Sequence, residues 1–467
     1  LKPFWLKPFW LKSWREIQVG MAEYKPIEYA PGGWRSAKVQ VTIVGLLAFC
    51  GPGLFNALNG LGSVGSSDPT VAAVANGCLY CTFAASSYFA GAAFNLFGPK
   101  PLFLLGGLSY AVFAACVFFT PQCRALAVVG GVVLGLGAGL FWAAQGSLMM
   151  AYATPQSRGW LIALFWMIFN LGGVVGGLLQ FALNYDNKGT SASPVSYFAF
   201  VAAMLVGALV SPCVLAPPAG VVRENGSAVS FEQAASPLEE LGAALQAVGD
   251  PFIKRNLLFF LASNWFYTYN FSGFNASQFN MRTRGLNSAL FWGAQMLAAW
   301  LFGSLLDAPV PPLERARKGA LMVSIGLVVS LGSALWVNTH SSCNHGRGWD
   351  KGFPCELDYL RDYQKAALPM VVYVLLGAVD AIYQNFAYWL MSMAAGSDVR
   401  RTVMYSAVYK GTQSLGAGIA WFLDYSPLIS YRLQGAVTLA LTLGACVPLP
   451  STFALLEPDK APKEAAA

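Results

Sequence analysis

The chain has 467 residues, of which 56% are hydrophobic and 11% charged, and its mean hydropathy is +0.52. Soluble domains of this total length would carry far more charge, so the composition excludes them and indicates a polytopic membrane protein. The net charge of +7 comes from short basic clusters between apolar runs. Such clusters fit a membrane-topology signal rather than a basic surface patch, so we predict no nucleic-acid partner.

The first twenty residues contain the pentapeptide LKPFW twice and no apolar run of signal-peptide length. We expect residues 1–20 to be either a gene-model extension or a basic aromatic surface segment, and we leave them out of the fold prediction. Together with the residues that follow, they form an N-terminal segment, 1–37, which we expect to be cytoplasmic.

Twelve apolar runs of roughly 20 residues follow, each bounded by charge, proline or glycine. The first six lie near residues 40–61, 71–97, 101–120, 125–153, 160–183 and 195–216. The last six lie near residues 257–279, 287–306, 319–338, 367–393, 402–424 and 432–454. This order predicts an all-α protein with a six-helix bundle at 38–217, a linker at 218–256, a second six-helix bundle at 257–454 and a tail at 455–467.

Two features of the polar segments complete this topology. Inside the linker, the run Ser236-Pro237-Leu238-Glu239 has the N-cap, N1 proline and N3 glutamate of a short amphipathic helix. Lysine and arginine residues near the ends of the spans are more frequent on the side that holds the linker. That bias predicts cytoplasmic termini and a cytoplasmic linker, in a plasma membrane or an endomembrane.

Two charged residues lie deep inside consecutive apolar spans: Asp380 in VLLGAVDAIYQNFAYWLM and Lys410 in YSAVYKGTQSLGAGIAWFLD. An ionised side chain at bilayer depth costs at least about 2.5 kcal/mol, so it persists only where it faces protein, water or a partner. Counting from Met393 and Arg401 places the two Cα atoms about 20 Å and 13 Å above the cytoplasmic end of their helices. We predict that they pair directly, either as a proton relay or substrate-coupled ion pair or as a structural bridge.

Amide and phenol side chains gather in several spans, where they must find partners inside the bundle. In the seventh span, Asn264, Tyr267 and Gln278 are separated by near-integral helical turns, which favours one shared face. We predict a cavity lined by these three residues with Asn56, Asn59, Tyr383, Gln384 and Gln413; interhelical hydrogen bonding is the alternative. Trp142 and Gln145 fit packing better than ligand contact.

The segment between the second and third spans reads Gly91-Ala-Ala-Phe-Asn95-Leu-Phe-Gly98-Pro99-Lys100, and Gly303-x-x-x-Asp307 ends the eighth span. These two motifs occupy matching places in the two halves. Arg158, Asn170 and Gly173 likewise align with Arg401, Gln413 and Gly416. Parallel repeats of this kind predict a binding cavity between the halves, near the middle of the membrane.

The segment from Gly91 to Lys100 resembles the loop signature of the major facilitator superfamily, with Asn95 where that family usually has aspartate. AFCGPGLFNALNGLG, SNWFYTYNFSGFNASQFNMRTRGLNS and YQNFAYWLM with YKGTQSLGAGIAW are similar to the fungal branch of the Unc-ninety-three-like family. The resemblance covers nearly all of residues 38–425. It implies the major facilitator fold, with twelve transmembrane helices in two bundles.

The resemblance implies two kinds of activity. Fungal members are described as transporters, whereas animal members of the wider family regulate ion channels or act as chaperones of receptors. The sequence thus predicts a secondary transporter of a small solute or ion, with Asp380 as the protonation site, or a regulator that binds another membrane protein. Glycines 172, 173, 176 and 177 would serve the regulator as a lipid-facing docking surface.

No nucleotide loop, catalytic triad or paired catalytic carboxylate is present, so we predict no enzymatic activity and no cofactor. His340, Cys343, His345 and Cys355 share one loop but fit no zinc spacing, so we predict no metal site. A disulfide between Cys343 and Cys355 is the interpretation that an oxidising compartment favours.

Overall fold

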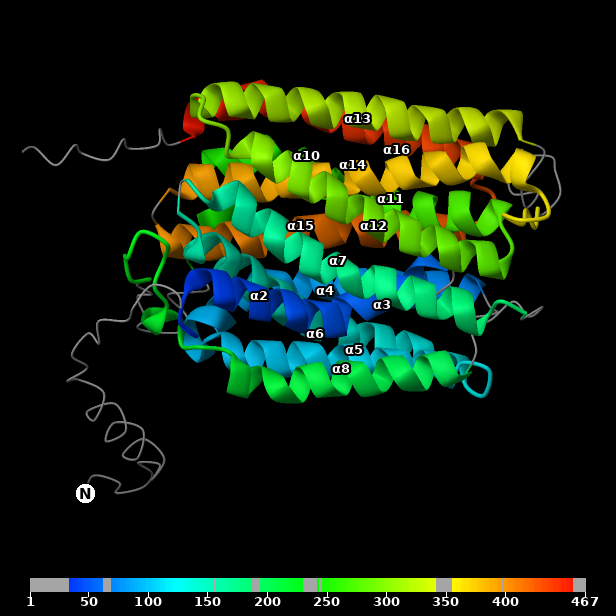
Figure 1. The fold of residues 1–467 in the computed structure, drawn as a ribbon, viewed down its shortest axis with the longest axis horizontal. Coiled ribbons are helices and arrows are strands. Elements are labelled where there is room, and N and C mark those ends of the chain that lie inside the picture. The colour runs from blue at the N-terminus through cyan, green and yellow to red at the C-terminus, as the bar shows by residue number, and fades with distance from the viewer. Residues whose placement is uncertain are drawn as a thin grey trace, which may run out of the picture.

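The computed structural model describes residues 33–61, 69–154, 156–186, 194–229, 242, 246–341, 355–396 and 398–456. Within these ranges the chain is helical, and β-structure is limited to isolated bridges such as the one between Ser36 and Val222. The helices run back and forth along the long axis of the molecule, roughly parallel to one another (Figure 1). Counting interrupted helices as one, the described residues form twelve spans.

The first half contains six spans. The first is interrupted and consists of α2 (Ala37–Ala48), the π-helix η1 (Phe49–Gly53) and α3 (Leu54–Gly60). The others are α4 (Pro69–Phe97), α5 (Pro99–Phe118), α6 (Arg124–Tyr152), α7 (Arg158–Leu183) and α8 (Pro194–Val214). Pro52 lies inside the π-helix, where its missing N–H accounts for the interruption.

The second half repeats this arrangement after the short 3₁₀-helix η3 (Pro218–Gly220) of the linker. Its first span consists of α10 (Pro251–Ala262), α11 (Phe266–Thr268) and the π-helix η4 (Tyr269–Ala276). The next four are α12 (Met281–Leu306), α13 (Pro312–His340), α14 (Tyr363–Ala395) and α15 (Val399–Tyr425). The last consists of α16 (Tyr431–Cys446), α17 (Leu449–Thr452) and the 3₁₀-helix η5 (Phe453–Leu455).

The seventh span begins six residues earlier than the sequence predicts. The Asp250 carboxylate accepts hydrogen bonds from the N–H groups of Phe252 and Ile253, and Pro251 occupies the first helical position. An aspartate N-cap followed by proline is a strong helix start, so residues 251–256 belong to α10 and not to the linker. The amphipathic helix predicted at Ser236 lies outside the described residues.

The two ends of the bundle are distinguished by their loops. At one end, the Ala37 N–H donates to the Val222 carbonyl at 2.9 Å, which ties the start of α2 to the linker. We call this the linker end; it lies on the left in Figure 1, and residues 355–362 lie at the opposite, far end. Nine of the described helices are long and apolar enough to cross a membrane.

The halves meet closely along α7 and α12, where glycines remove the side chains that would keep the helices apart. A Cβ on Gly177 would lie 2.6 Å from the Ala289 backbone nitrogen, and one on Gly173 would lie 2.4 Å from the Trp292 ring. Gly172 and Gly176 contact the first span in the same way. The prediction that these four glycines form a lipid-facing docking surface is therefore wrong, because they serve internal packing.

Candidate functional site

Asp380 on α14 and Lys410 on α15 are both buried, with 0% and 3% of their surface exposed. They do not contact each other, so the predicted direct ion pair is wrong. Two glutamines join them instead, because Gln384 follows Asp380 by one helical turn and Gln413 follows Lys410 by nearly one. Gln384 Nε2 donates to Asp380 Oδ1 at 2.6 Å, Gln413 Nε2 to Gln384 Oε1 at 3.0 Å, and Lys410 Nζ to Gln413 Oε1 at 2.8 Å.

The other oxygen of Asp380 is linked to the first half through Gln295, a residue of the second half. Gln295 Nε2 on α12 donates to Asp380 Oδ2 at 2.7 Å, and Asn170 Nδ2 on α7 donates to Gln295 Oε1 at 3.2 Å. Each carboxylate oxygen therefore accepts an amide N–H, which offsets part of the cost of burying the charge. The chain Asn170–Gln295–Asp380–Gln384–Gln413–Lys410 is the polar core of the site; we call it the amide relay.

The ammonium of Lys410 lies among aromatic rings. Its nitrogen is 4.4 Å from the ring centroid of Trp142, 5.1 Å from that of Tyr409 and 5.3 Å from that of Tyr388. Trp142 belongs to α6 in the first half, and its Nε1–H donates to Tyr110 Oη at 2.9 Å. The cation–π contact with Trp142 thus joins the lysine to the first half, so Trp142, which the sequence assigns to packing, contacts the site directly.

A cavity of about 40 Å³ lies beside the relay, with room for roughly three water molecules. Both halves line it. The lining residues are Pro52, Phe55, Asn56, Leu79, Tyr80, Phe83, Tyr110, Leu134, Ala138, Trp142, Trp166, Phe169, Asn264, Tyr267, Gln384, Lys410 and Gln413. Five of the predicted lining residues are therefore in place: Asn56, Asn264, Tyr267, Gln384 and Gln413.

Three of the predicted lining residues lie elsewhere. Asn59 Oδ1 accepts from Asn76 Nδ2 on α4 at 3.4 Å, and the Tyr383 hydroxyl donates to the Phe259 backbone carbonyl at 2.9 Å. Tyr383 also stacks on the Phe259 ring, with centroids 4.1 Å apart. Asp380 and Gln384 share a face of α14, whereas Tyr383 is turned toward α10, so proximity in sequence to Asp380 was a poor guide.

The third, Gln278, donates from Nε2 to Asn338 Oδ1 on α13 at 2.9 Å. The prediction assumed three regular α-helical turns between Tyr267 and Gln278. Residues 269–276 form the π-helix η4 instead, in which each residue turns by a smaller angle about the helix axis. Gln278 is therefore rotated away from the cavity and toward α13.

At the linker end, Asp307 joins the two halves. It follows α12 directly, and its carboxylate accepts from the N–H groups of Gly159 and Trp160 at 2.8 and 2.6 Å. These groups open α7, whose N-cap residue, Ser157, makes no capping hydrogen bond of its own. A carboxylate at a helix N-terminus is favoured by both hydrogen bonding and the helix dipole. Asp307 thus acts as the cap of a helix in the other half.

Close contacts or backbone conformation explain why glycine occupies these positions in the two loop motifs. A Cβ on Gly303 would lie 2.8 Å from Ala163 Cβ and 2.9 Å from the Gly159 carbonyl, so glycine lets Asp307 reach α7. Gly98 has a φ of 74°, which favours glycine, and it precedes the Pro99 that starts α5. A Cβ on Gly91 would meet Ala407 of α15 at 3.4 Å.

In the repeat of the two halves, Asn95 corresponds to Asp307 and α15 corresponds to α7. In the second half, α15 begins with its own N-cap, because Asp398 accepts from the Arg401 N–H at 3.0 Å. That helix therefore needs no carboxylate from the other half, unlike α7. The halves therefore differ in how they cap these helices. Lys100, which follows Gly98 and Pro99, is half-buried at the start of α5.

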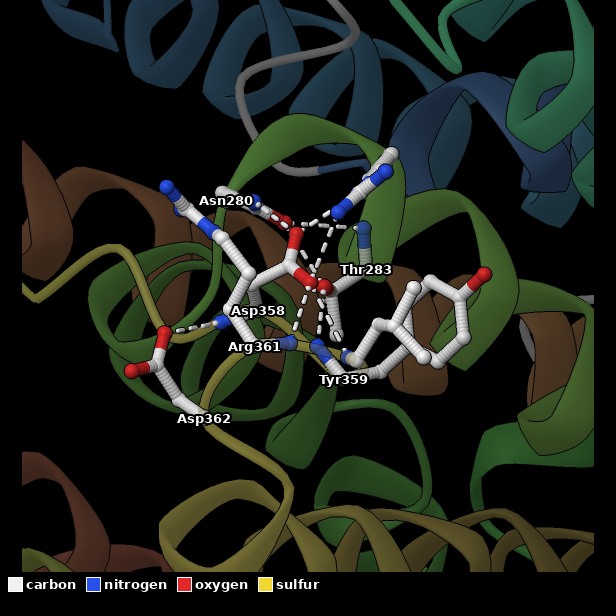
Figure 2. A network of polar contacts seen from close by, with 8 residues as sticks. Asn280, Thr283, Asp358, Tyr359, Arg361 and Asp362 are labelled. Carbon is white, nitrogen blue, oxygen red and sulfur yellow. Dashed lines mark hydrogen bonds and ion pairs between the residues drawn. The ribbon is translucent and has the colours of Figure 1, made fainter.

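At the far end, Asp358 lies at the centre of a network of polar contacts (Figure 2). Its carboxylate accepts from Arg282 Nε and Nη2 at 2.6 and 2.8 Å, from Asn280 Nδ2 at 2.6 Å, and from the backbone N–H groups of Leu360 and Arg361. The Arg282 guanidinium so held lies 5.0 Å from the ring centroid of Tyr185, which follows α7 in the first half. Asp358 therefore holds the arginine against the opposite half.

The far-end network predicts a dependence of stability on pH. Loss of water alone would raise the pKa of Asp358, but hydrogen bonds from Arg282, the Arg361 N–H and Asn280 lower it well below its ordinary value. A carboxylate with a lowered folded-state pKa stabilises the protein above its unfolded pKa of about 3.9 and loses that contribution as pH falls further. We expect on the order of 1–2 kcal/mol to be lost on acidification below about pH 4.

Thermal unfolding in detergent at pH 6 and at pH 3 measures this loss. Other carboxylates titrate in the same range, so the quantity of interest is the difference between the protein and Asp358→Asn. The melting temperature should fall more on acidification in the protein with Asp358. Equal falls in both proteins would contradict the role of this carboxylate.

Two remaining features do not belong to the central site. A larger cavity of about 670 Å³ lies among α7, α12, α13 and α14, but its lining residues are all apolar, so nothing in it would orient a polar solute. Cys355 is disulfide-bonded; its predicted partner, Cys343, lies outside the described residues together with His345, so that pairing stays a prediction. Among the residues that the structure describes, no group of three metal-ligating side chains occurs.

Gln295 and Asn170 are the members of the relay that sequence reasoning missed as site residues. Gln295 is an amide in the middle of an otherwise apolar span, and that isolation was the available signal. Asn170 was recognised through its alignment with Gln413. Both residues belong to the relay and so link the first half to Asp380.

Comparison with known proteins identifies the superfamily to which this fold belongs. The family described as Major Facilitator Superfamily matches residues 41–421. A bacterial homologue of the iron transporter ferroportin in its outward-facing state superposes with a TM-score of 0.60 at 14% identity, covering 89% of this chain and 99% of that one. The E. coli xylose transporter XylE gives 0.57 at 12% identity, with 88% and 95% covered. The predicted major facilitator fold is confirmed.

Proteins of similar sequence identify the family within this superfamily. UNC93-like protein 1 of Arabidopsis thaliana is 38% identical over 400 residues, covering 84% of this chain and 85% of the relative. An UNC93-like protein of Schizosaccharomyces pombe is 33% identical over 423 residues, covering 88% and 80%. The chain belongs to the UNC93-like family of the Major Facilitator Superfamily, as its motifs predicted. Placement in the fungal branch stays a prediction, because the relatives include plant and fungal proteins.

Proposed function

We propose that this protein is a secondary transporter that carries a small solute through a central site by alternating access. The observation that carries the proposal is the polar cavity beside the amide relay, which is lined by both halves and contains the buried Lys410. Polar groups that are costly at bilayer depth are retained where they serve a solute or ion pathway. The major facilitator fold supports a transporter-like membrane protein.

The contacts at the two ends support alternation. Asp307 closes the linker end through two hydrogen bonds to α7, and Arg282 closes the far end through its contact with Tyr185. The packing of α7 against α12 also joins the halves, so opening either end must separate these helices as well as break the polar contacts, without unfolding a bundle. With both ends closed around a small cavity, the described conformation fits an occluded intermediate.

Asp380 is our candidate for the coupling site. Its two oxygens accept amide hydrogen bonds from Gln295 and Gln384, one from α12 and one from its own helix. Protonation would remove the negative charge that these amides face and would weaken both bonds. Because the relay continues to Asn170 in one direction and to Lys410 in the other, a change at Asp380 reaches both halves.

Flux into proteoliposomes tests the function. We would measure uptake of a panel of labelled sugars, amino acids, carboxylates, amines and potassium, with and without a pH gradient. Asp380→Asn should reduce the component driven by the pH gradient at least tenfold, whereas Asp186→Asn, at an exposed aspartate of the far end, should leave it unchanged. Absence of flux across the whole panel, or equal flux in Asp380→Asn, would contradict the proposal.

A regulator of another membrane protein is the alternative that the sequence left open. Its predicted docking surface, the glycines of α7, is used inside the molecule. The amide relay also has no evident use in a protein that only binds a partner, since buried polar groups at this depth are costly. The transporter is therefore the function that these residues support better.

A further inference from the structure

Resting on the proposed transport function, we propose that the central cavity takes a small organic anion, with the carboxylate at Lys410 and an apolar or aromatic body against the first half. The chemistry of the cavity wall carries this proposal. The names of the UNC93-like relatives specify no substrate.

The charge of the wall selects an anion over a cation. Among the described residues that line the cavity, Lys410 is the one basic side chain and none is a carboxylate; the others are apolar, amide or phenol side chains. Asp380 does not line the cavity, and amides occupy both of its oxygens. A solute in the cavity would therefore meet an ammonium group and no carboxylate, which favours a negative charge in a low-dielectric site.

The ammonium of Lys410 also has hydrogen-bonding capacity to offer. A lysine has three N–H donors, and the structure gives Lys410 a single acceptor, Gln413 Oε1 at 2.8 Å. Its other neighbours are the rings of Trp142, Tyr409 and Tyr388. Two donor positions thus face ring faces, which are weaker partners than a carboxylate oxygen. A carboxylate would satisfy them.

The rest of the cavity indicates the shape of the solute. Most of the polar side chains come from the second half, where Asn264, Tyr267 and the two glutamines of the relay adjoin Lys410; Asn56 is the one amide from the first half. On the side of the first half, the wall consists largely of rings and aliphatic chains. It includes Phe55, Tyr80, Phe83, Trp166 and Phe169. This division suits a molecule with one charged end and one flat apolar end.

A benzoate-sized ligand needs more room than the 40 Å³ of the closed cavity. Such a ligand would enter when one end of the bundle opens, and the halves would then close around it. Because Trp142 and Lys410 come from different halves and lie 4.4 Å apart, separation of the halves at this point would free both the ring and the ammonium for the ligand.

Equilibrium dialysis of radiolabelled benzoate against the full chain in lipid nanodiscs at pH 7 tests the proposal. We expect saturable binding that unlabelled benzoate competes, but that neutral benzamide, cationic benzylamine and chloride do not. Lys410→Met should weaken binding at least tenfold, and Lys410→Arg should restore most of it. Lys318→Met, which removes an exposed lysine paired with Glu314, should bind as the unaltered protein does. Thermal unfolding of each variant in the same nanodiscs shows whether it is folded.

Three results would overturn the proposal: no saturable benzoate binding, saturable benzylamine binding that depends on the cavity, or unchanged benzoate binding in folded Lys410→Met. Benzoate binding in Lys410→Arg that falls as far as in Lys410→Met would also contradict a role for the positive charge. Flux of a neutral or cationic solute in the panel above would support the transport function but contradict an organic anion as the substrate. Absence of flux for every solute in the panel would contradict the proposed transport function itself.

Discussion

Replacing Gln384 by leucine should abolish transport and lower the free energy of unfolding by about 3 kcal/mol. Gln384 donates to Asp380 Oδ1 at 2.6 Å and to the Tyr267 hydroxyl at 3.1 Å, and its carbonyl accepts from Gln413. Leucine is close in size but leaves a buried carboxylate with half its hydrogen bonds. It also separates Asp380 from Lys410 by removing the link between the two glutamines.

Flux and thermal unfolding of Gln384→Leu in the same membrane preparation measure both effects. The matched control is Gln364→Leu, which makes the same chemical change at an exposed position near the start of α14. That control should lose less than about 0.5 kcal/mol and retain its flux, as surface substitutions usually do. A Gln384→Leu variant as stable and active as the control would mean that the amide relay is not part of the working site.

Replacing Asp307 by alanine should open the linker end. The substitution removes two hydrogen bonds between a carboxylate and the first turn of α7, so the closed state loses about 2 kcal/mol relative to the open one. An energy of that size changes the ratio of closed to open molecules by roughly 30-fold. Spin labels at Gln156 and Ser304, exposed positions on the two sides of this contact, would report a longer distance.

Asp398→Ala is the control for this change. Asp398 also caps a helix N-terminus, that of α15, but it immediately precedes the helix it caps and so does not join the halves. Its loss should destabilise the protein by about 1 kcal/mol and leave the distance between the labels unchanged. An unchanged distance in Asp307→Ala, or an equal change in both variants, would show that the carboxylate does not hold the two halves together.

The sequence predicted the fold because the signals for it are strong and local. Runs of apolar residues of membrane-spanning length specify the helices, and a linker of different composition divides them. The loop motifs around Gly91 and Gly303 identified the superfamily before any contact was known. The start of α10 was missed because six of its residues precede the apolar run, although Asp250 and Pro251 carry the signal for it.

The sequence predicted where the site residues lie along their helices, but not which residues they contact. Depth along a helix follows from counting residues, so Asp380 and Lys410 were placed correctly near the middle of the bundle. Their partners depend on which way each helix faces its neighbour, which a single sequence does not specify. The amides of Gln384 and Gln413 therefore came between two charges that had been expected to meet.

Backbone irregularity was the second source of error. The π-helix at residues 269–276 changes the angular relation between Tyr267 and Gln278, and no periodicity argument anticipated it. Regular spacing placed both residues on one face, whereas Tyr267 lines the cavity and Gln278 contacts Asn338. Irregular helices of this kind are frequent where helices line functional sites.

The central claim, that two opposed closures alternate around one site, is tested most directly by distances at both ends of the molecule. Spin labels at Gln156 and Ser304 report the linker end, and labels at the exposed Asp186 and Glu356 report the far end. Pulsed electron spin resonance in nanodiscs would compare the unaltered protein with Asp307→Ala and Asp358→Ala. We predict that Asp307→Ala lengthens the linker-end distance alone and Asp358→Ala the far-end distance alone. Both distances lengthening together in either variant, or neither changing in either, would contradict alternating access.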